Sequence, residues 1–180
     1  MKVYVLRHGT TVWNEEGRTQ GRRQNKLSVS GKKLAEQTAE KLKNEKIDVI
    51  YASPLMRTMQ TSNIVNTYHN AKIVKSELLT EVDQGIFSGR LYRTLTEEEK
   101  QLKKERHPST KMETLEQAFE RTKEFVETIL KKETHENVMI VTHNNICSIL
   151  EWIFKGVSPD LSDRSQMNMF GNAEVRIYDI

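Results

Sequence analysis

An arginine and a histidine stand side by side near the amino end of the chain, directly after an apolar run. The pair is Arg7 and His8, and the run before it, Val3–Leu6, predicts a short buried strand. A guanidinium can hold an anion through two parallel hydrogen bonds, and an imidazole can act as a nucleophile or a general acid or base near pH 7. Gly9 follows, and a residue without a side chain lets a ligand approach the backbone. The pattern indicates chemistry on an anionic substrate.

Two further apolar runs end in polar residues in the same way. Ser53 follows residues 47–52, with Arg57 one turn into the helix expected next, and His143 follows the run at 138–141. In open α/β sheets ligands bind beyond the carboxyl ends of the strands, so these side chains can meet without being close in the sequence. Helix N-termini after Ser53 and His143 would add partial positive charge. A phosphoryl group is the natural candidate for such a crevice.

A fourth segment supplies carboxylates. Glu81 and Asp83 precede a turn that is bracketed by Gly85 and Gly89. A carboxylic acid near the crevice could protonate a departing alcohol oxygen. Glu81 is a candidate for this acid, and Asp83 is interpreted as a side chain without a catalytic role.

The elements that must position these residues alternate along the chain. Strands are expected at residues 2–7, 47–52, 71–75, 138–141 and 173–180, the last of them at a sheet edge. Helices are expected from Ser30-Gly31 to residue 42, from Ser53-Pro54 as cap and first residue to about Tyr68, and over 91–106, 114–130 and 144–154. This alternation predicts an α/β fold: a single domain over residues 1–180 with a mostly parallel sheet and helices on both faces.

Composition restricts the class of protein. The chain has 180 residues, of which 36% are hydrophobic and 29% charged, enough for one globular domain with a substantial core. A net charge of +3 is too mild to indicate a nucleic-acid partner, and no apolar run approaches the ~20 residues of a membrane span. The single cysteine, Cys147, excludes an internal disulfide. We expect a cytoplasmic protein that acts on a small molecule, and a homodimer stays open.

A metal site is not indicated. His8, His143, Glu81 and Asp83 are the residues that could supply ligands, but they lack the tight spacing that metal motifs have. We therefore expect chemistry without a metal or other cofactor.

Short motifs follow one another in order over nearly the whole chain. They are Leu6-Arg7-His8-Gly9-Thr10-Thr11 with Asn14, Gln20-Gly21, Leu27, Ser30-Gly31, Ser53-Pro54-Leu55-Met56-Arg57-Thr58, Glu81 with Gly85 and Gly89, and Val141-Thr142-His143. The Arg-His-Gly triplet alone is a weak signal, but the ordered set is highly specific. It resembles the histidine phosphatase superfamily, in its phosphoglycerate-mutase-like branch.

The resemblance implies a phosphohistidine mechanism without a metal. His8 would attack phosphorus in line, while Arg7, Arg57 and His143 hold the equatorial oxygens. Glu81 would protonate the leaving oxygen and then deprotonate the attacking water. Roles in binding the phosphate or the rest of the substrate are implied for Asn14, Gln20, Gly21 and Asn144.

The chain departs from the family pattern in two places. Many relatives carry two glycines after the second histidine, where Asn144-Asn145 stands here, and these side chains could narrow or polarise the pocket. After Gln20-Gly21, a basic loop, Arg22-Arg23-Gln24-Asn25-Lys26, replaces the usual aromatic, acid and proline. Its cations are as consistent with an exposed loop as with contact to the edge of the substrate. Both departures bear on the substrate more than on the reaction.

We predict a phosphomonoester hydrolase that acts on a small phosphorylated metabolite. Residues 90–112 would form a small helical cap, whose basic character could admit a second anionic group, although Lys103, Lys104 and Arg106 are interpreted as a solvated helix face. The alternative enzyme is a cofactor-dependent phosphoglycerate mutase, which needs a well-closed site to keep water from its phosphohistidine. Only about 60 residues separate Glu81 from His143, so the cap is modest and hydrolysis is favoured. A catalytically silent regulatory protein on the same fold is the alternative of another class.

Overall fold

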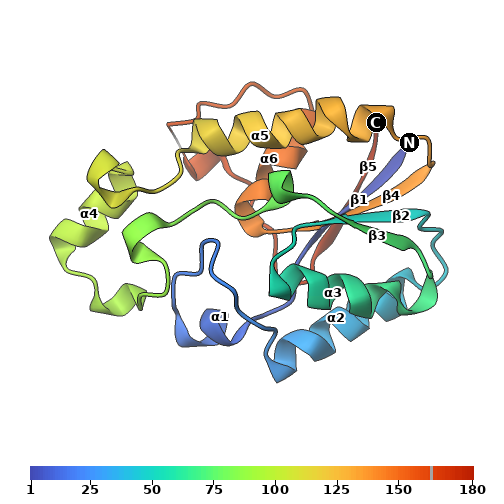
Figure 1. Cartoon of the computed structure of the whole chain (residues 1–180), viewed down its shortest axis with the longest axis horizontal. Coiled ribbons are helices and arrows are strands. Elements are labelled where there is room, and N and C mark those ends of the chain that lie inside the picture. Colours follow the sequence, from blue (N-terminus) through green and yellow to red (C-terminus); the bar gives the residue numbers. More distant parts are fainter. Residues whose placement is uncertain (163) are drawn as a thin grey trace.

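A five-stranded sheet forms the centre of the computed structural model, which describes residues 1–162 and 164–180 (Figure 1). The strands lie in the order β3-β2-β4-β1-β5. Their bounds are β1 Lys2–Arg7, β2 Val49–Ala52, β3 Lys72–Lys75, β4 Asn137–Thr142 and β5 Val175–Asp179. The first four are parallel, and β5 runs antiparallel along β1 at the edge. The predicted mostly parallel sheet with a final edge strand is confirmed.

Helices cover both faces of this sheet (Figure 1). The pair α2 (Val29–Leu42) and α3 (Met56–Val65) lies on one face, and α5 (Leu115–Thr128) and α6 (Asn144–Phe154) lie on the other. A short helix, α1 (Val12–Glu16), follows the first strand. Short 3-10 turns occupy Asn66–Tyr68, Glu77–Leu79, Gly85–Phe87, Tyr92–Thr94, Pro108–Thr110, Leu130–Lys132 and Arg164–Gln166. Among the described residues, no helix has the length and apolar character needed to cross a membrane.

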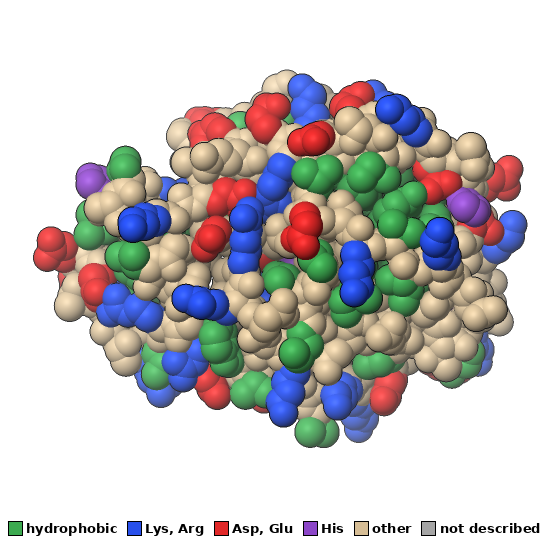
Figure 2. Space-filling view, in the orientation of Figure 1, with side chains coloured by type: hydrophobic (Ala, Val, Ile, Leu, Met, Phe, Trp, Pro, Cys, Tyr) green, Lys and Arg blue, Asp and Glu red, His purple; other side chains and the backbone are tan. Residues whose placement is uncertain are grey.

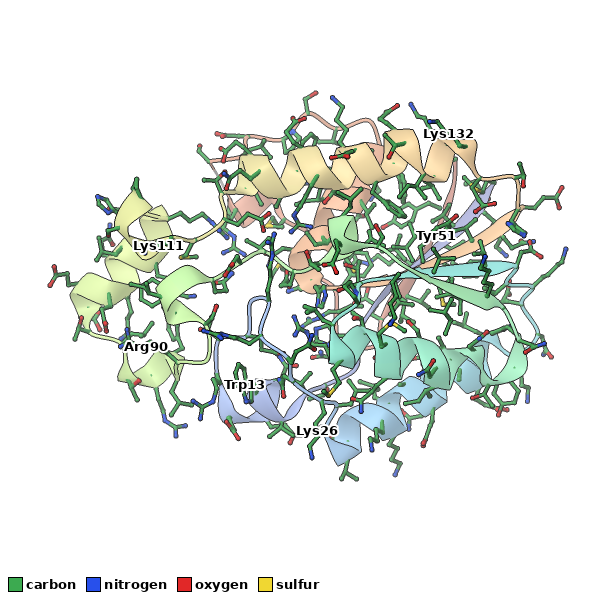
Figure 3. All side chains as sticks on the ribbon, viewed as in Figure 1. Trp13, Lys26, Tyr51, Arg90, Lys111 and Lys132 are labelled. Carbon is green, nitrogen blue, oxygen red and sulfur yellow. The ribbon has the colours of Figure 1, made fainter. Side chains whose placement is uncertain are left out.

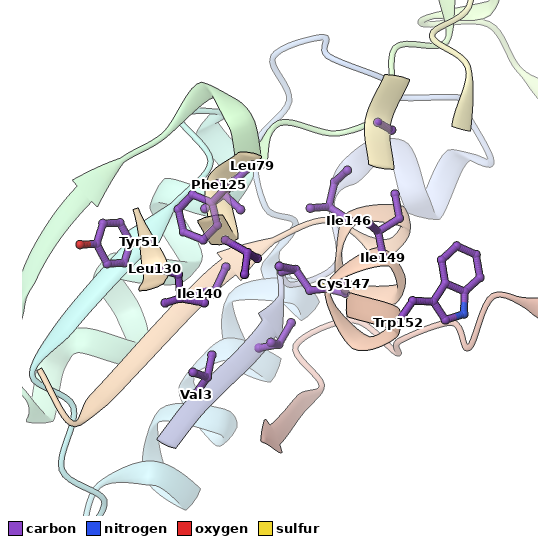
Figure 4. Close-up of a cluster of buried hydrophobic side chains, with 14 of the residues drawn as sticks. Val3, Tyr51, Leu79, Phe125, Leu130, Ile140, Ile146, Cys147, Ile149 and Trp152 are labelled. Carbon is purple, nitrogen blue, oxygen red and sulfur yellow. The ribbon is translucent and has the colours of Figure 1, made fainter. Parts of the chain in front are cut away.

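The central strands are apolar on both sides because each side packs against helices. Along β1, Val3 and Val5 belong to the core under α5 and α6, whereas Tyr4 and Leu6 belong to the core over α2 and α3. All four are fully buried. Figure 4 shows the larger core, in which Cys147 packs as a small apolar side chain among its neighbours.

Two helices begin at residues other than those expected from the sequence. The α2 helix starts at Val29 rather than at Ser30-Gly31, because the Ser28 side chain accepts a hydrogen bond from the Gly31 amide and caps it. The α3 helix starts at Met56, three residues after Ser53, so Ser53 is not its cap. The Ser53 hydroxyl is used in the site described below.

Residues 90–112 lie beyond the carboxyl ends of the parallel strands (Figure 1). The helix expected over 91–106 is shorter in the structure, where α4 spans Glu97–Glu105. Its start is fixed by a capping box between Thr96 and Glu99. A separate apolar cluster of Phe87, Leu95 and Met112 supports the segment.

The first turn of α2 approaches the loop after His8 without room for a side chain. A Cβ added to Gly31 would lie 1.8 Å from the carbonyl oxygen of Thr10. The distance is far below van der Waals contact, so the loop and the helix could not both keep their places. This contact holds the residues after His8 against the fold.

We expect Gly31→Ala to lower the free energy of unfolding by roughly 1–3 kcal/mol, because the backbone must shift to admit the methyl group. Urea denaturation monitored by circular dichroism measures the change. The matched control is Gly171→Ala, where the nearest atom is the flexible carboxylate of Glu174 at 3.2 Å. Equal losses in the two variants would show that the α2 contact is not tight.

Candidate active site

Three adjacent strands bring distant residues to one edge of the sheet. In the order β2-β4-β1, their carboxyl ends lead to Ser53, His143 and His8. The ring centroids of the two histidines lie 5.2 Å apart in an edge-on arrangement. The parallel pairing of β1 with β4 produces this contact, since the two strands end at the same level.

The guanidinium of Arg57 lies between the two imidazoles and is almost completely buried. Its Nε is 3.2 Å from His8 Nε2 and 3.1 Å from His143 Nδ1. Its Nη1 donates to the carbonyl oxygen of Arg23 at 3.0 Å, and its Nη2 donates to that of Gly21 at 2.8 Å. One side chain therefore joins both histidines to the loop that holds these carbonyls.

These contacts assign the protons of both rings. An arginine Nε–H only donates, so His8 Nε2 and His143 Nδ1 must accept and carry lone pairs. The His8 proton lies on Nδ1, which donates to the Gly9 carbonyl oxygen at 2.7 Å. The His143 proton lies on Nε2, 2.8 Å from the Ser53 hydroxyl oxygen. His8 therefore holds an unprotonated Nε2 beside Arg57, the form that a nucleophile requires.

Burial and the nearby positive charge keep both histidines neutral. Desolvation, followed by the charge of Arg57, holds the pKa of His8 and that of His143 well below the usual 6.5. Burial also lowers the pKa of Arg57, to about 10, so its guanidinium stays charged at neutral pH. The centre of the site thus carries one fixed cation between two uncharged bases.

A pocket of about 260 Å³ opens over His8 and Arg57. Eight of the nine residues that the sequence assigns to the site line it: Arg7, His8, Asn14, Gln20, Gly21, Arg57, Glu81 and Asn144. The ninth, His143, is fully buried and contacts Arg57 and His8 without lining the pocket. Asp83 also lies outside it and accepts a hydrogen bond from the Gly85 amide.

Arg7 and Asn14 have donors left for a ligand. The Arg7 guanidinium donates through Nη1 to the Phe170 carbonyl, and its buried Nε has no hydrogen-bond partner among the described residues. The Asn14 side-chain oxygen is occupied by the backbone amide and hydroxyl of Thr11, in the capping box of α1. A buried donor is normally paired, so Arg7 is suited to an anion in the pocket. The half-buried side chain of Asn14 also lines the pocket, and its amide nitrogen can donate there.

Glu81 is held in place by two donors to its Oε1. They are the Val82 amide at 2.8 Å and the Asn145 side-chain Nδ2 at 3.0 Å. The carboxamide of Asn145 is itself oriented, because Arg164 Nη2 donates to its oxygen. Asn145 is therefore a positioning residue for Glu81.

Asn144, in contrast, supports the other side of the pocket. Its side-chain oxygen accepts a hydrogen bond at 2.9 Å from the amide of Phe170, whose carbonyl accepts from Arg7. The asparagines that stand in place of the family's two glycines thus both make specific contacts with residues 164–170.

Three basic side chains line the pocket although the sequence does not assign them to it. Lys103 was expected on a solvated helix face, and that interpretation is wrong, because its Nζ donates to Gln84 Oε1 at 2.7 Å beside the pocket. Arg18 and Arg164 line the pocket as well. No periodic or motif signal marks these residues, which reach the pocket from the loop after α1, from α4 and from the segment after α6.

Of the other basic residues near the site, Arg22 and Arg106 contact the protein itself. Arg22 donates to the Glu81 carbonyl oxygen at 3.1 Å and pairs with Glu113 at 2.8 Å, whereas Lys26 is exposed. Arg106 is half-buried and donates to the Glu113 carbonyl, so the solvated interpretation is wrong for it too. Within residues 1–162 and 164–180, no group of three or more His, Cys, Asp and Glu residues is arranged to hold a metal ion.

Residues 3–180 match the family model of the histidine phosphatase superfamily (branch 1). The chain belongs to this family. It is 33% identical over 149 residues to phosphoserine phosphatase 1 of Hydrogenobacter thermophilus, which covers 79% of this chain and 71% of that protein. It is 38% identical over 99 residues to probable phosphoglycerate mutase GpmB of Enterobacter sp. (strain 638), covering 55% of this chain and 46% of that protein. The solved structure of Bacillus stearothermophilus YhfR superposes with a TM-score of 0.88 at 25% identity, covering 99% and 91% of the two chains.

The two neutral histidines of this family member should make its stability sensitive to acid. In the unfolded chain each imidazole binds a proton near pH 6.5, whereas in the folded protein the depressed pKa keeps it neutral to lower pH. Their contribution to the free energy of unfolding is therefore complete above pH 6.5. As the pH falls this free energy decreases, by about 1.4 kcal/mol for each histidine at pH 5.5.

Urea denaturation at pH 7.5 and pH 5.5 measures this loss. In His143→Gln the difference in the free energy of unfolding between the two pH values should shrink by about 1.4 kcal/mol, whereas the exposed His107→Gln should leave it unchanged. The same difference in wild type and His143→Gln would contradict the neutral assignment.

Proposed function

We propose that the protein is a phosphomonoester hydrolase that works through a phosphohistidine on His8. The observation that carries the proposal is the unprotonated Nε2 of His8, beside the charged Arg57 in a pocket with free Arg7 and Asn14 donors. A lone pair next to preorganised cations is what in-line attack on a phosphoryl group needs.

In the first step the Nε2–phosphorus bond forms and the phosphorus–oxygen bond to the alcohol breaks. Glu81 gives its proton to the leaving oxygen, and the Asn145 hydrogen bond aims the carboxyl group at it. Arg57 transfers its Nε hydrogen bond from the imidazole to a phosphoryl oxygen, which frees the His8 lone pair. His143 can then contact the phosphoryl group only after it takes up a proton on Nδ1.

In the second step water attacks phosphorus and the bond to Nε2 breaks. Glu81, now a carboxylate, takes the proton of this water, and inorganic phosphate leaves. His8 returns to the neutral state with its proton still on Nδ1, where the Gly9 carbonyl holds it.

Residues 90–112 act as the cap over this site. The backbone of Thr19 exchanges hydrogen bonds with Gly89 and Arg90, which attaches the start of the cap to the loop that lines the pocket. Trp13 on α1 lies beside this segment, which carries Arg90 and Lys111 (Figure 3). Lys103 on α4 brings the cap to the pocket itself.

Hydrolysis is favoured over the mutase reaction, although relatives carry both names. The match to the phosphatase spans most of both chains, whereas the match to the mutase spans less than half of that relative. A trace of 2,3-bisphosphoglycerate added to 3-phosphoglycerate separates the two. A hydrolase releases inorganic phosphate, and a mutase forms 2-phosphoglycerate without net release. A silent protein would release no phosphate from p-nitrophenyl phosphate or from any ester of a broad panel.

His8→Ala should abolish phosphate release, because it removes the imidazole lone pair that attacks phosphorus in the proposed reaction. The assay follows p-nitrophenolate and inorganic phosphate in parallel. The matched control is His107→Ala, which removes an exposed imidazole on the cap and should keep the wild-type rate. Turnover in His8→Ala within about tenfold of wild type would rule out the phosphohistidine.

Glu81→Gln should separate the two steps. It should slow hydrolysis of alkyl phosphates by about 10²–10⁴-fold, since the alkoxide needs a proton. With p-nitrophenyl phosphate, whose leaving group needs none, it should release one p-nitrophenolate per protein molecule in a burst and then stall. Asn145→Ala, which frees the Glu81 carboxyl group, should slow alkyl esters more than p-nitrophenyl phosphate. Equal slowing of both esters without a burst would assign the proton transfers elsewhere.

A further inference from the structure

Three cations of the pocket take no part in the proposed reaction at phosphorus, and one of them, Arg18, is paired with Glu16. The other two are Lys103 and Arg164. Lys103 comes from the last turn of α4, and Arg164 comes from the segment after α6. Both line the same pocket as His8 and Glu81. On the face shown in Figure 2, Lys and Arg side chains gather where the α4 segment meets the body of the protein, with acidic side chains among them.

The direct partners of these two cations are neutral. Lys103 Nζ donates to the carboxamide oxygen of Gln84, and Arg164 donates to that of Asn145. Three other partly buried arginines are paired with carboxylates, namely Arg90 with Glu99, Arg121 with Glu113 and Arg176 with Glu151. The arginines nearer the pocket, Arg7, Arg57 and Arg106, donate to backbone carbonyls instead. Lys103 and Arg164 therefore keep a positive charge that no described carboxylate neutralises through an ion pair.

Glu81, in the same pocket, attracts Arg164 without forming an ion pair with it, whereas the charges that act on Lys103 are those of two arginines. Burial, together with the charges of Arg106 and Arg164, lowers the pKa of Lys103 to about 8. The ammonium group also stands 5.1 Å from the centre of the Phe87 ring, which excludes water on that side. Arg106 itself has two buried nitrogens without a hydrogen-bond partner among the described residues. An anion beside these cations would relieve their repulsion.

We propose that Lys103 and Arg164 form a second anion subsite, which binds a carboxylate or a second phosphate carried by the same substrate whose ester phosphate lies at His8. The inference rests on the proposed function and gives its substrate class: small phosphomonoesters with a further anionic group. Because Asn145 holds Arg164, the asparagine that replaces a family glycine supplies this subsite with one of its cations.

Matched pairs of esters that differ in one anionic group test the subsite. The carboxylate pair is 3-phosphoglycerate against glycerol 3-phosphate, and the phosphate pair is fructose 1,6-bisphosphate against fructose 6-phosphate. We expect kcat/KM to be at least about tenfold higher for the more anionic member of one pair. The pair that shows this preference tells whether the subsite binds a carboxylate or a second phosphate. Equal values within both pairs would overturn the proposal.

Lys103→Gln is the decisive variant, because Arg164→Gln also removes the hydrogen bond that orients Asn145. It should reduce the preference within the favoured pair by about tenfold, mainly through KM. Lys104→Gln, which removes the same charge from a neighbouring exposed position on α4, is the control and should keep the preference. A preference that survives in Lys103→Gln would exclude the subsite.

The pH dependence of this substrate preference shows whether Lys103 acts through its charge or only supports the structure. With a pKa of about 8, Lys103 of the free protein loses its proton as the pH rises through 8, so the preference should decline above that pH. Lys103→Arg should keep the preference to higher pH, because a guanidinium stays charged. A preference that is flat across pH 8 in wild type would contradict the role of Lys103.

Equilibrium binding separates this inference from the proposed function. Calorimetry with His8→Ala compares the affinity of the same ester pairs without turnover. Tighter binding of the more anionic ester, lost in His8→Ala/Lys103→Gln, would support the subsite even if wild type released no phosphate from any ester. Phosphate release without any difference in affinity would retain the hydrolase and reject the subsite.

Discussion

The site depends on one buried guanidinium. Arg57 donates to two imidazoles and to two backbone carbonyls, so it fixes the tautomer of His8 and the position of the loop after Gln20 at once. Burial, and after it the charge of Arg57, lowers the pKa of both histidines and keeps them neutral. A buried cation without a carboxylate partner is costly, and it persists here because every hydrogen-bonding nitrogen has an acceptor. The guanidinium of Arg57 therefore has no anionic hydrogen-bond partner among the described residues until an anion binds in the pocket.

Much of this arrangement could be predicted from the sequence. Apolar runs that end in Arg7-His8, Ser53 and His143 predict neighbouring strands whose ends meet, and the sheet order β2-β4-β1 has this form. Strand periodicity and the rule for ligand sites in parallel sheets are sufficient for that step. The ordered motifs then add the family, which the match over residues 3–180 confirms.

Other parts could not be predicted, and the reasons are physical. Ser53-Pro54 has the form of a helix start, but the Ser53 hydroxyl is used by His143, and a tertiary hydrogen bond overrides the local signal. Lys103 follows the pattern of a solvated face, because the periodicity of a short polar helix does not reveal what lies across from it. Arg164 enters the pocket only through its contact with Asn145, and no spacing rule relates these two residues.

The sole cysteine of the chain, Cys147, lies on the buried face of α6, where burial raises the pKa of its thiol far above the usual range. A thiol that does not ionise reacts slowly with peroxides and alkylating reagents. The reaction proposed for His8 uses no thiol, so it would not depend on a group that such reagents modify.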